Sequence, residues 1–301
     1  MNEYIREEII SDGQTKRLNN SRLNCCGKML ILFMLLDIAF QAVSGLFLPK
    51  GVTAALCPLI SFIITFYVVC GKETTGLTKG MFVAVKGDRT RIMGGMSDCM
   101  FYFAIITLGL GVIAAVFDLV EVDIFSEAIK VSVPLKGFDG VVYAIYMCIL
   151  APVMHEVIFR GVVIRSLEGR GKKTAVFVSA VLFALFHGTY ITNLYAFAMG
   201  MVIGGIAVKS GSLITTLKMN IICSSFVYLT MFAVWKNFAL LYIPLLVVFG
   251  FFAVMGLLRK ILGMGCRRKV KEKIDFNVLG TLAVVGTVIL MVAEDLMFFL
   301  A

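Results

Sequence analysis

The sequence predicts an all-α protein, a polytopic bundle of about eight or nine transmembrane helices in a cell membrane. Hydrophobic residues make up 60% of the 301 residues, and charged residues make up only 16%. This composition is too apolar for a soluble domain of the same size. The apolar residues are gathered in runs of roughly 20, which is the length that a helix needs to cross the hydrocarbon of a bilayer.

The predicted transmembrane helices follow a polar N-terminal segment. Residues 1–28 are polar and carry no small-residue cleavage site, so we interpret them as a cytoplasmic leader and not as a signal peptide. The apolar runs that follow are Met29–Leu48, Val52–Cys70, Asp98–Val120, Gly137–Ile164, Thr174–Ile191, Leu194–Val208, Ser212–Val234, Phe238–Leu258 and Phe276–Leu300. Each is near the length of one crossing, although the sixth run is short and the fourth is long.

The basic residues predict the orientation of the chain, because cytoplasmic loops carry the excess of Lys and Arg. With a cytoplasmic N-terminus, the opposite side of the membrane receives only Lys50, Lys130, Lys136 and Lys236. The net charge of +9 therefore reflects topology. No basic stripe alternates with aromatic residues, so nucleic acid is excluded as a partner and the lipid bilayer is expected.

A cluster of ionisable residues interrupts the fourth apolar run. His155, Glu156 and Arg160 lie within six residues of one another, and their flanks are almost wholly apolar. Such residues are costly to bury in a membrane, so they persist mainly where they face the bundle interior and act together. On a helix, Glu156 and Arg160 have the i, i+4 spacing of an ion pair, while His155 points about 100° away from Glu156.

Polar residues in two further runs are predicted to lie at a similar depth. With a rise of ~1.5 Å per residue, His155 lies roughly 15 Å from the cytoplasmic end of its run, and His187 lies roughly 20 Å into the fifth run. Asn220 and Ser224 lie roughly 12 and 18 Å into the seventh run, on one face of its helix. Each residue alone is also typical of a hydrogen bond between helices. Together with the Glu156–Arg160 pair, they predict a site that three helices build.

Three motifs carry a resemblance to a known family. They are Pro152-x-x-His155-Glu156-x-x-x-Arg160-Gly161, Phe183-x-x-x-His187, and Gly211-Ser212 leading into Asn220-x-x-x-Ser224. This pattern resembles the CPBP family of intramembrane proteases, which contains the CAAX prenyl-protein endopeptidases and bacterial proteins linked to bacteriocin processing or self-immunity. The resemblance implies a CAAX-protease-like core over residues 137–234. Around it stand the leader 1–28, accessory helices in 29–136 and C-terminal helices in 235–301.

Two of the three motifs depart from the family pattern. The leading Glu of the family's EExxxR motif is His155 here, whereas Glu156 and Arg160 are kept. The His of the family's third motif is Asn220, and its Asn or Asp partner is Ser224. Only the FxxxH motif is intact, so the resemblance implies the family's site with altered chemistry.

The resemblance implies an endopeptidase that hydrolyses peptide bonds of membrane-associated peptides or membrane proteins. Its catalytic set would be His155, Glu156, Arg160, His187, Asn220 and Ser224. In a metalloprotease-like version, a zinc ion would be held by His155, Glu156 and His187, but adjacent residues diverge on a helix. In a metal-free version, His155 replaces a carboxylate as general base, because an imidazole titrates near neutral pH. The Asn220 amide and the Ser224 hydroxyl would then donate hydrogen bonds to an oxyanion.

Two other functions remain open. The first is a catalytically inactive relative that binds a peptide or lipid, in bacteriocin self-immunity or as a scaffold, and His155 in place of Glu favours it. The second is a small-solute transporter in which His155 and Glu156 relay protons. It is disfavoured because the sequence contains no inverted repeat and no paired interrupted helices.

Overall fold

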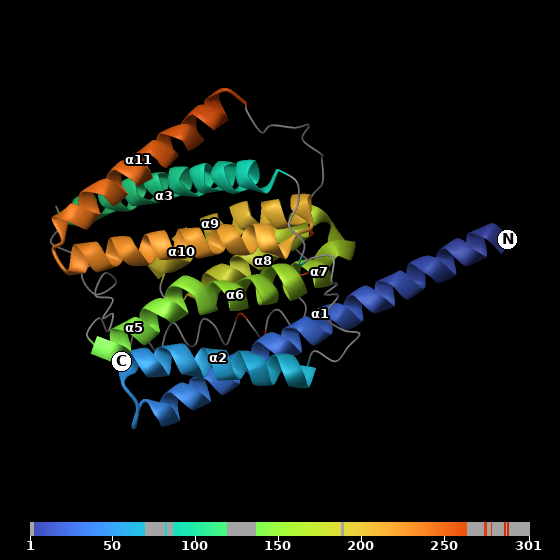
Figure 1. The fold of residues 1–301 in the computed structure, drawn as a ribbon. Coiled ribbons are helices and arrows are strands. Elements are labelled where there is room, and N and C mark those ends of the chain that lie inside the picture. The colour runs from blue at the N-terminus through green and yellow to red at the C-terminus, as the bar shows by residue number, and fades with distance from the viewer. Residues whose placement is uncertain are drawn as a thin grey trace.

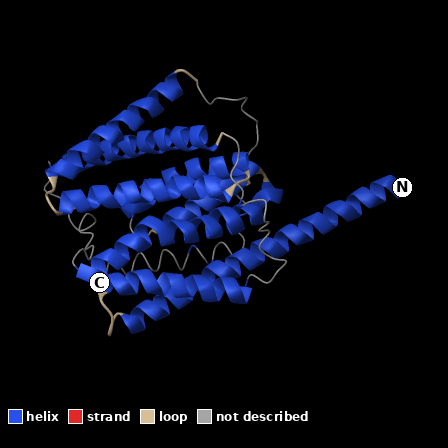
Figure 2. Ribbon diagram, in the orientation of Figure 1, coloured by secondary structure: helices blue, strands red, loops and turns tan. Residues whose placement is uncertain are grey.

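The computed structural model describes residues 3–69, 82, 87–118, 137–187, 190–263, and positions 274, 275, 278, 286 and 288. Within these residues the regular structure is helical, with no strand (Figure 2). The helices pack into one bundle, from which the N-terminal part of α1 projects (Figure 1). The predicted class, an all-α polytopic bundle, is confirmed.

The long helices in chain order are α1 (Glu3–Ser44), α2 (Lys50–Val69), α3 (Asp88–Asp118), α8 (Lys172–Leu185), α9 (Tyr190–Ser210), α10 (Leu213–Trp235) and α11 (Ala239–Ile261). Between α3 and α8 lies one helical segment with changing hydrogen-bond patterns. It consists of α5 (Gly137–Ile145), η2 (Tyr146–Leu150), α6 (Ala151–His155), η3 (Glu156–Val163) and α7 (Ile164–Leu167), followed by the short 3₁₀ turn η4 (Glu168–Arg170).

Seven segments among the described residues are long and apolar enough to cross a membrane. The fifth predicted span is shorter than expected, because α8 has 14 residues. That length corresponds to about 21 Å, less than the ~30 Å of a hydrocarbon core. The ninth, Phe276–Leu300, lies almost entirely outside the described residues. In the predicted leader, α1 begins at Glu3 and continues without a break into the first span.

The fourth predicted span contains two stretches of π-helix, η2 and η3. In η2 the N–H of Ala151 bonds to the carbonyl of Tyr146, and in η3 the N–H of Ile164 bonds to the carbonyl of Phe159. Pro152, two residues after the end of η2, has no N–H to continue an α-helical pattern, which accounts for the first stretch. The second stretch carries Glu156 and Arg160. π-Helical turns are rare and are frequent at functional sites.

Close packing of small residues holds the central helices together. An added Cβ at Gly200 of α9 would lie 3.0 Å from the Cα of Ala180 in α8, so the two backbones are close and a side chain here would press against α8. At Gly256 of α11 the same atom would collide with the carbonyl oxygen of Ser97 in α3. Such small-residue contacts are typical of helix pairs in membranes.

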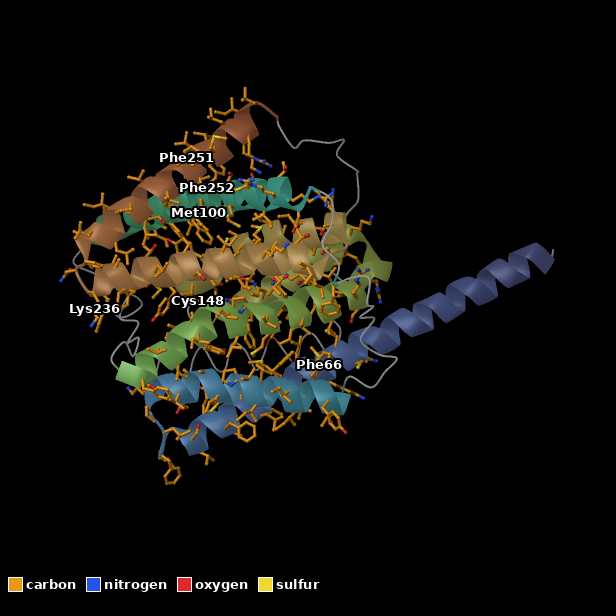
Figure 3. All side chains as sticks on the ribbon, viewed as in Figure 1. Phe66, Met100, Cys148, Lys236, Phe251 and Phe252 are labelled. Atoms are coloured by element: carbon orange, nitrogen blue, oxygen red, sulfur yellow. The ribbon has the colours of Figure 1, made fainter. Side chains whose placement is uncertain are left out.

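α10 occupies the middle of the bundle. It contacts α3, α9 and α11 as well as α6, η2 and η3, and in Figure 1 it lies alongside α6. The outer helices carry exposed apolar side chains instead of charges, as Phe251 on α11 illustrates (Figure 3). An apolar exterior of this kind suits lipid and not water. The protein is therefore a multi-pass membrane protein, and α10 carries the buried polar residues Thr215, Thr216 and Asn220 into its interior.

Candidate functional site

The Glu156 carboxylate is the centre of a chain of polar contacts that joins η3 to α10. Its Oε1 atom lies 3.3 Å from Nη1 of Arg160, one turn later on the same segment. The same oxygen accepts a hydrogen bond of 2.7 Å from Nδ2 of Asn220. Oδ1 of Asn220 in turn accepts a hydrogen bond of 3.2 Å from the Ser224 hydroxyl. The carboxylate is thus held by a cation from its own helix and by an amide from another.

This polar chain is buried and not fully satisfied. Glu156 is 1% exposed, Arg160 2% and Asn220 0%. Among the described residues, Oε2 of Glu156 has no hydrogen-bond partner, and neither do Nε, Nη1 and Nη2 of Arg160. The contact between Glu156 and Arg160 is therefore an ion pair without hydrogen-bond alignment. Buried polar atoms without a partner are uncommon, and they are often explained by a ligand, a water molecule or a catalytic role.

The two histidines form a second group inside a box of aromatic rings. The ring centroids of His155 and His187 are 5.3 Å apart. The His155 ring stands edge-on to Phe183 at 5.2 Å and to Phe186 at 5.7 Å, and Phe159 lies 6.1 Å away. These rings pack against the His155 imidazole and restrict its orientation.

A hydrogen bond sets the protonation of His187. Its Nδ1 atom lies 2.7 Å from the carbonyl oxygen of Phe183. A carbonyl oxygen only accepts, so Nδ1 carries the proton, and in the neutral ring Nε2 is left with a free lone pair. The Thr192 hydroxyl donates to the His187 carbonyl at 3.1 Å and fixes the backbone at this position. His187 is therefore oriented to accept a proton through Nε2.

Phe183 connects the two groups. The Cζ atom of Arg160 lies 4.5 Å from the centre of the Phe183 ring, a cation–π distance. The same ring is 4.6 Å from the ring of His187. The intact FxxxH motif thus places one aromatic ring in contact with both the Arg160 guanidinium and the His187 imidazole.

The structure brings the predicted residues together in two groups, not one. Glu156, Arg160, Asn220 and Ser224 make the polar chain, and the two histidines meet among the aromatic rings. Neighbouring positions 155 and 156 diverge because one residue step on a helix turns the side chain by about 100°. These residues lie on the α6–η3 segment, in the turn after α8 and on α10, the three parts of the chain for which a similar depth was predicted.

The predicted zinc ligands do not fit a zinc ion. A structural or catalytic zinc site takes at least three nitrogen, sulfur or oxygen donors that converge on one point. Within the part of the chain that the structure describes, no three His, Cys, Asp or Glu side chains are grouped in this way. The Glu156 carboxylate faces Arg160 and Asn220, whereas the adjacent His155 ring lies beside His187 among aromatic rings, so the three predicted donors do not converge.

Two aromatic residues of the site were not predicted. Phe159 and Phe186 complete the box around His155. Phe159 follows His155 by four residues, a spacing that places both on one helix face and was a usable signal. The Phe159 carbonyl also accepts a hydrogen bond of 2.9 Å from the Ser179 hydroxyl of α8, which ties η3 to that helix. Nothing in the spacing of Ser179 indicates this contact.

A comparison with known protein families finds a match over the region that contains the candidate site. Residues 137–226 match a family model described as Rce1-like, type II CAAX prenyl endopeptidase. No curated protein and no solved structure matches the chain. The matched residues include every member of the polar chain and both histidines. The resemblance to the CAAX-protease and bacteriocin-processing family is therefore confirmed for these helices.

Proposed function

We propose that this multi-pass membrane protein, whose residues 137–226 are of the CAAX-protease type, is an intramembrane endopeptidase. Its substrates would be peptides or proteins associated with the membrane. The single observation that carries the proposal is the buried Glu156 carboxylate, which has one oxygen fixed by Asn220 and Arg160 and the other unused. Burying a charged group this deeply in a membrane protein costs free energy, and groups that are buried in this way are concentrated at functional sites.

In the proposed reaction, a water molecule attacks the carbonyl carbon of the scissile peptide bond. Its proton passes to an imidazole, with Nε2 of His187 as the free acceptor and His155 beside it. The carbon–nitrogen bond then breaks, and the imidazolium returns the proton to the leaving amine nitrogen. The unused Oε2 of Glu156 would accept a hydrogen bond from the attacking water and orient it.

The Asn220 side chain is proposed to stabilise the oxyanion that forms on the scissile carbonyl. Its Nδ2 atom carries two hydrogens, and only one of them is used by Glu156. The hydrogen bond from Ser224 to Oδ1 keeps the amide from rotating, so the second hydrogen has a fixed direction. Ser224 would then be a positioning residue and would not touch the substrate. Donors fixed in advance in a buried site supply a large part of catalysis.

A second function, a non-catalytic binding protein, is favoured by one observation. His155, in place of a carboxylate, packs edge-on against aromatic rings and lies beside His187, as a buried structural histidine does. Such a protein would use the same group of residues to hold a peptide or lipid as a scaffold or as a self-immunity factor. The two functions differ in whether new peptide termini arise.

The proposal is tested by comparing protein termini in cells that express the wild type, Glu156→Gln or His187→Ala at matched levels. Lys236→Ala is the matched control, because Lys236 is exposed at the end of α10 and contacts Trp235, not the site. Termini that appear with the wild type and the control, but with neither site variant, support a protease. Identical termini in all four samples favour the binding protein. The proposed orientation, with a cytoplasmic N-terminus in the cell membrane, is checked by protease protection of tagged termini.

A further inference from the structure

A small cavity lies beside Arg160. The residues of the fourth span that line it follow the histidine His155 in the sequence and do not include it. The volume of the cavity is about 50 Å³, enough for a few water molecules or one small anion. Arg160 and Arg165 line it from the fourth span, Ala207 lines it from α9, and Ser212 and Leu213 line it from the start of α10. None of the described residues that line it is acidic. The lining therefore contains two guanidinium groups and no carboxylate, although Arg160 is also paired with Glu156 behind it.

The start of α10 adds further donors to this cavity. Gly211 has a φ of +68°, which turns the chain sharply from α9 into α10. Ser212 caps the helix, and its hydroxyl accepts a hydrogen bond of 3.4 Å from the N–H of Thr215. The first N–H groups of a helix have no partner within the helix and carry a partial positive charge. The start of a 23-residue helix is therefore favourable for an anion.

Arg160 is the independent sign that the cavity takes a ligand. Its side chain is 2% exposed, and within the described part of the chain none of its guanidinium nitrogens has a hydrogen-bond partner. The ion pair with Glu156 and the Phe183 ring occupy one edge and one face of the guanidinium. Five N–H donors on a planar fork match a carboxylate or phosphate group, and several of them are unused here.

The cavity also lies at the level of the membrane surface. The candidate spans that surround it end at Leu167 and Ser210 and begin at Leu213. The ends of membrane-spanning helices lie near the polar headgroups of the lipids. Basic pockets between helices at this level are suited to the phosphate of a lipid headgroup. A dissolved phosphate ion offers the same oxygens.

From these observations we propose that the cavity formed by Arg160, Arg165 and the start of α10 binds a phosphate-type oxyanion. An anion in the cavity would attract the Arg160 guanidinium and weaken its hold on Glu156. Occupancy of the cavity would then change the position of a carboxylate in the candidate active site. Binding itself requires no peptide cleavage, so this proposal and the proposed protease can fail separately.

The test measures the thermal unfolding midpoint of protein purified in a maltoside detergent, which contains no phosphate. Inorganic phosphate is titrated against chloride at equal ionic strength. A saturable rise of the midpoint with phosphate alone is expected, because a ligand of the folded state stabilises it. Arg165→Gln, which removes a donor, and Ala207→Leu, which fills the cavity, are each expected to weaken the apparent affinity by at least about tenfold.

Lys209→Gln is the matched control, since Lys209 is exposed at the end of α9 and does not line the cavity. It should behave as the wild type. A second arm repeats the titration in the same phosphate-free maltoside detergent, with or without added phosphatidic acid. A phosphate response that phosphatidic acid abolishes assigns the cavity to a lipid headgroup, and a response that persists assigns it to the free ion. The proposal is overturned by a midpoint that phosphate does not raise, or by equal phosphate affinity in the wild type, Arg165→Gln and Ala207→Leu.

Discussion

Nδ2 of Asn220 donates a hydrogen bond of 2.7 Å to Oε1 of Glu156 and so joins the middle of α10 to the π-helical segment η3. The contact links positions that are 64 residues apart in the chain. Because both side chains are buried, water does not compete for this bond. It fixes the direction of the carboxylate and of the amide at the same time.

Replacement of Asn220 tests this relationship first. Asn220→Asp places a second carboxylate against Glu156, and two adjacent buried carboxylates repel each other unless one takes up a proton. We expect Asn220→Asp to lower stability more than Asn220→Ala, which loses a hydrogen bond to a charged group worth about 1.5–3 kcal/mol. Thermal unfolding in detergent measures both variants. Equal stability of Asn220→Asp and the wild type would contradict the buried contact.

Removal of Arg160 is expected to be more damaging. Arg160→Ala leaves the Glu156 carboxylate buried without its cation, a change that typically costs about 3–5 kcal/mol. The abundance of the protein in membranes and its unfolding midpoint should both fall. Lys236→Ala serves as a control at an exposed cation, and it should alter neither quantity. Normal abundance of Arg160→Ala would show that the carboxylate does not depend on this guanidinium.

Substitution of Ser224 distinguishes a positioning role of its hydroxyl in catalysis from a purely structural role. Ser224→Ala removes the hydrogen bond to Oδ1 of Asn220, which costs about 0.5–1.5 kcal/mol of stability. If the hydroxyl orients the amide for an oxyanion, kcat should fall by more than stability predicts while KM changes little. Ser224→Thr, which keeps a hydroxyl, should restore kcat. A fall in stability with no change in kcat would leave Ser224 with a structural role alone.

The histidine pair is tested by three substitutions compared for turnover. His187→Ala removes the proposed proton acceptor, and loss of a general base typically lowers the rate by about 10²- to 10⁴-fold. His155→Ala should also lower turnover, whereas His155→Glu, which restores a carboxylate beside His187, should retain or raise it. The unfolding midpoints of the three proteins identify any loss that comes from misfolding. Equal turnover in His155→Ala, His155→Glu and the wild type would remove His155 from the mechanism.

Much of the bundle could be predicted because apolar length and basic flanks report directly on membrane spans. The i, i+4 spacing of Glu156 and Arg160 and the common depth of polar residues in three spans indicated which side chains meet. Only one of the two contacts of Phe183 could be predicted. Helical spacing places its ring beside His187, but nothing in the sequence indicates its contact with Arg160. Contacts between helices depend on crossing geometry, which composition does not specify.

Other features could not be read from the sequence. The length of α8 was overestimated, because the apolar run continues through Phe186 after the helix ends at Leu185. Hydrophobicity indicates burial and not helical conformation, so an apolar turn cannot be distinguished from the end of an apolar helix. The π-helical stretch η3 was also not predicted, since a span that is apolar on most faces has only a weak periodic pattern. The cavity beside Arg160 depends on the packing of α7, α9 and α10 and leaves no sequence signal.

The measurement that tests the central claim most directly is hydrolysis by the purified protein in liposomes, in water enriched in a heavy oxygen isotope. The substrate is the peptide sequence identified from the new termini in cells. The account predicts that the new carboxyl terminus carries heavy oxygen with the wild type and with Lys236→Ala, and that Glu156→Gln and His187→Ala produce almost none. Cleavage at equal rates by Glu156→Gln, or no cleavage by any form, would contradict a protease built around Glu156.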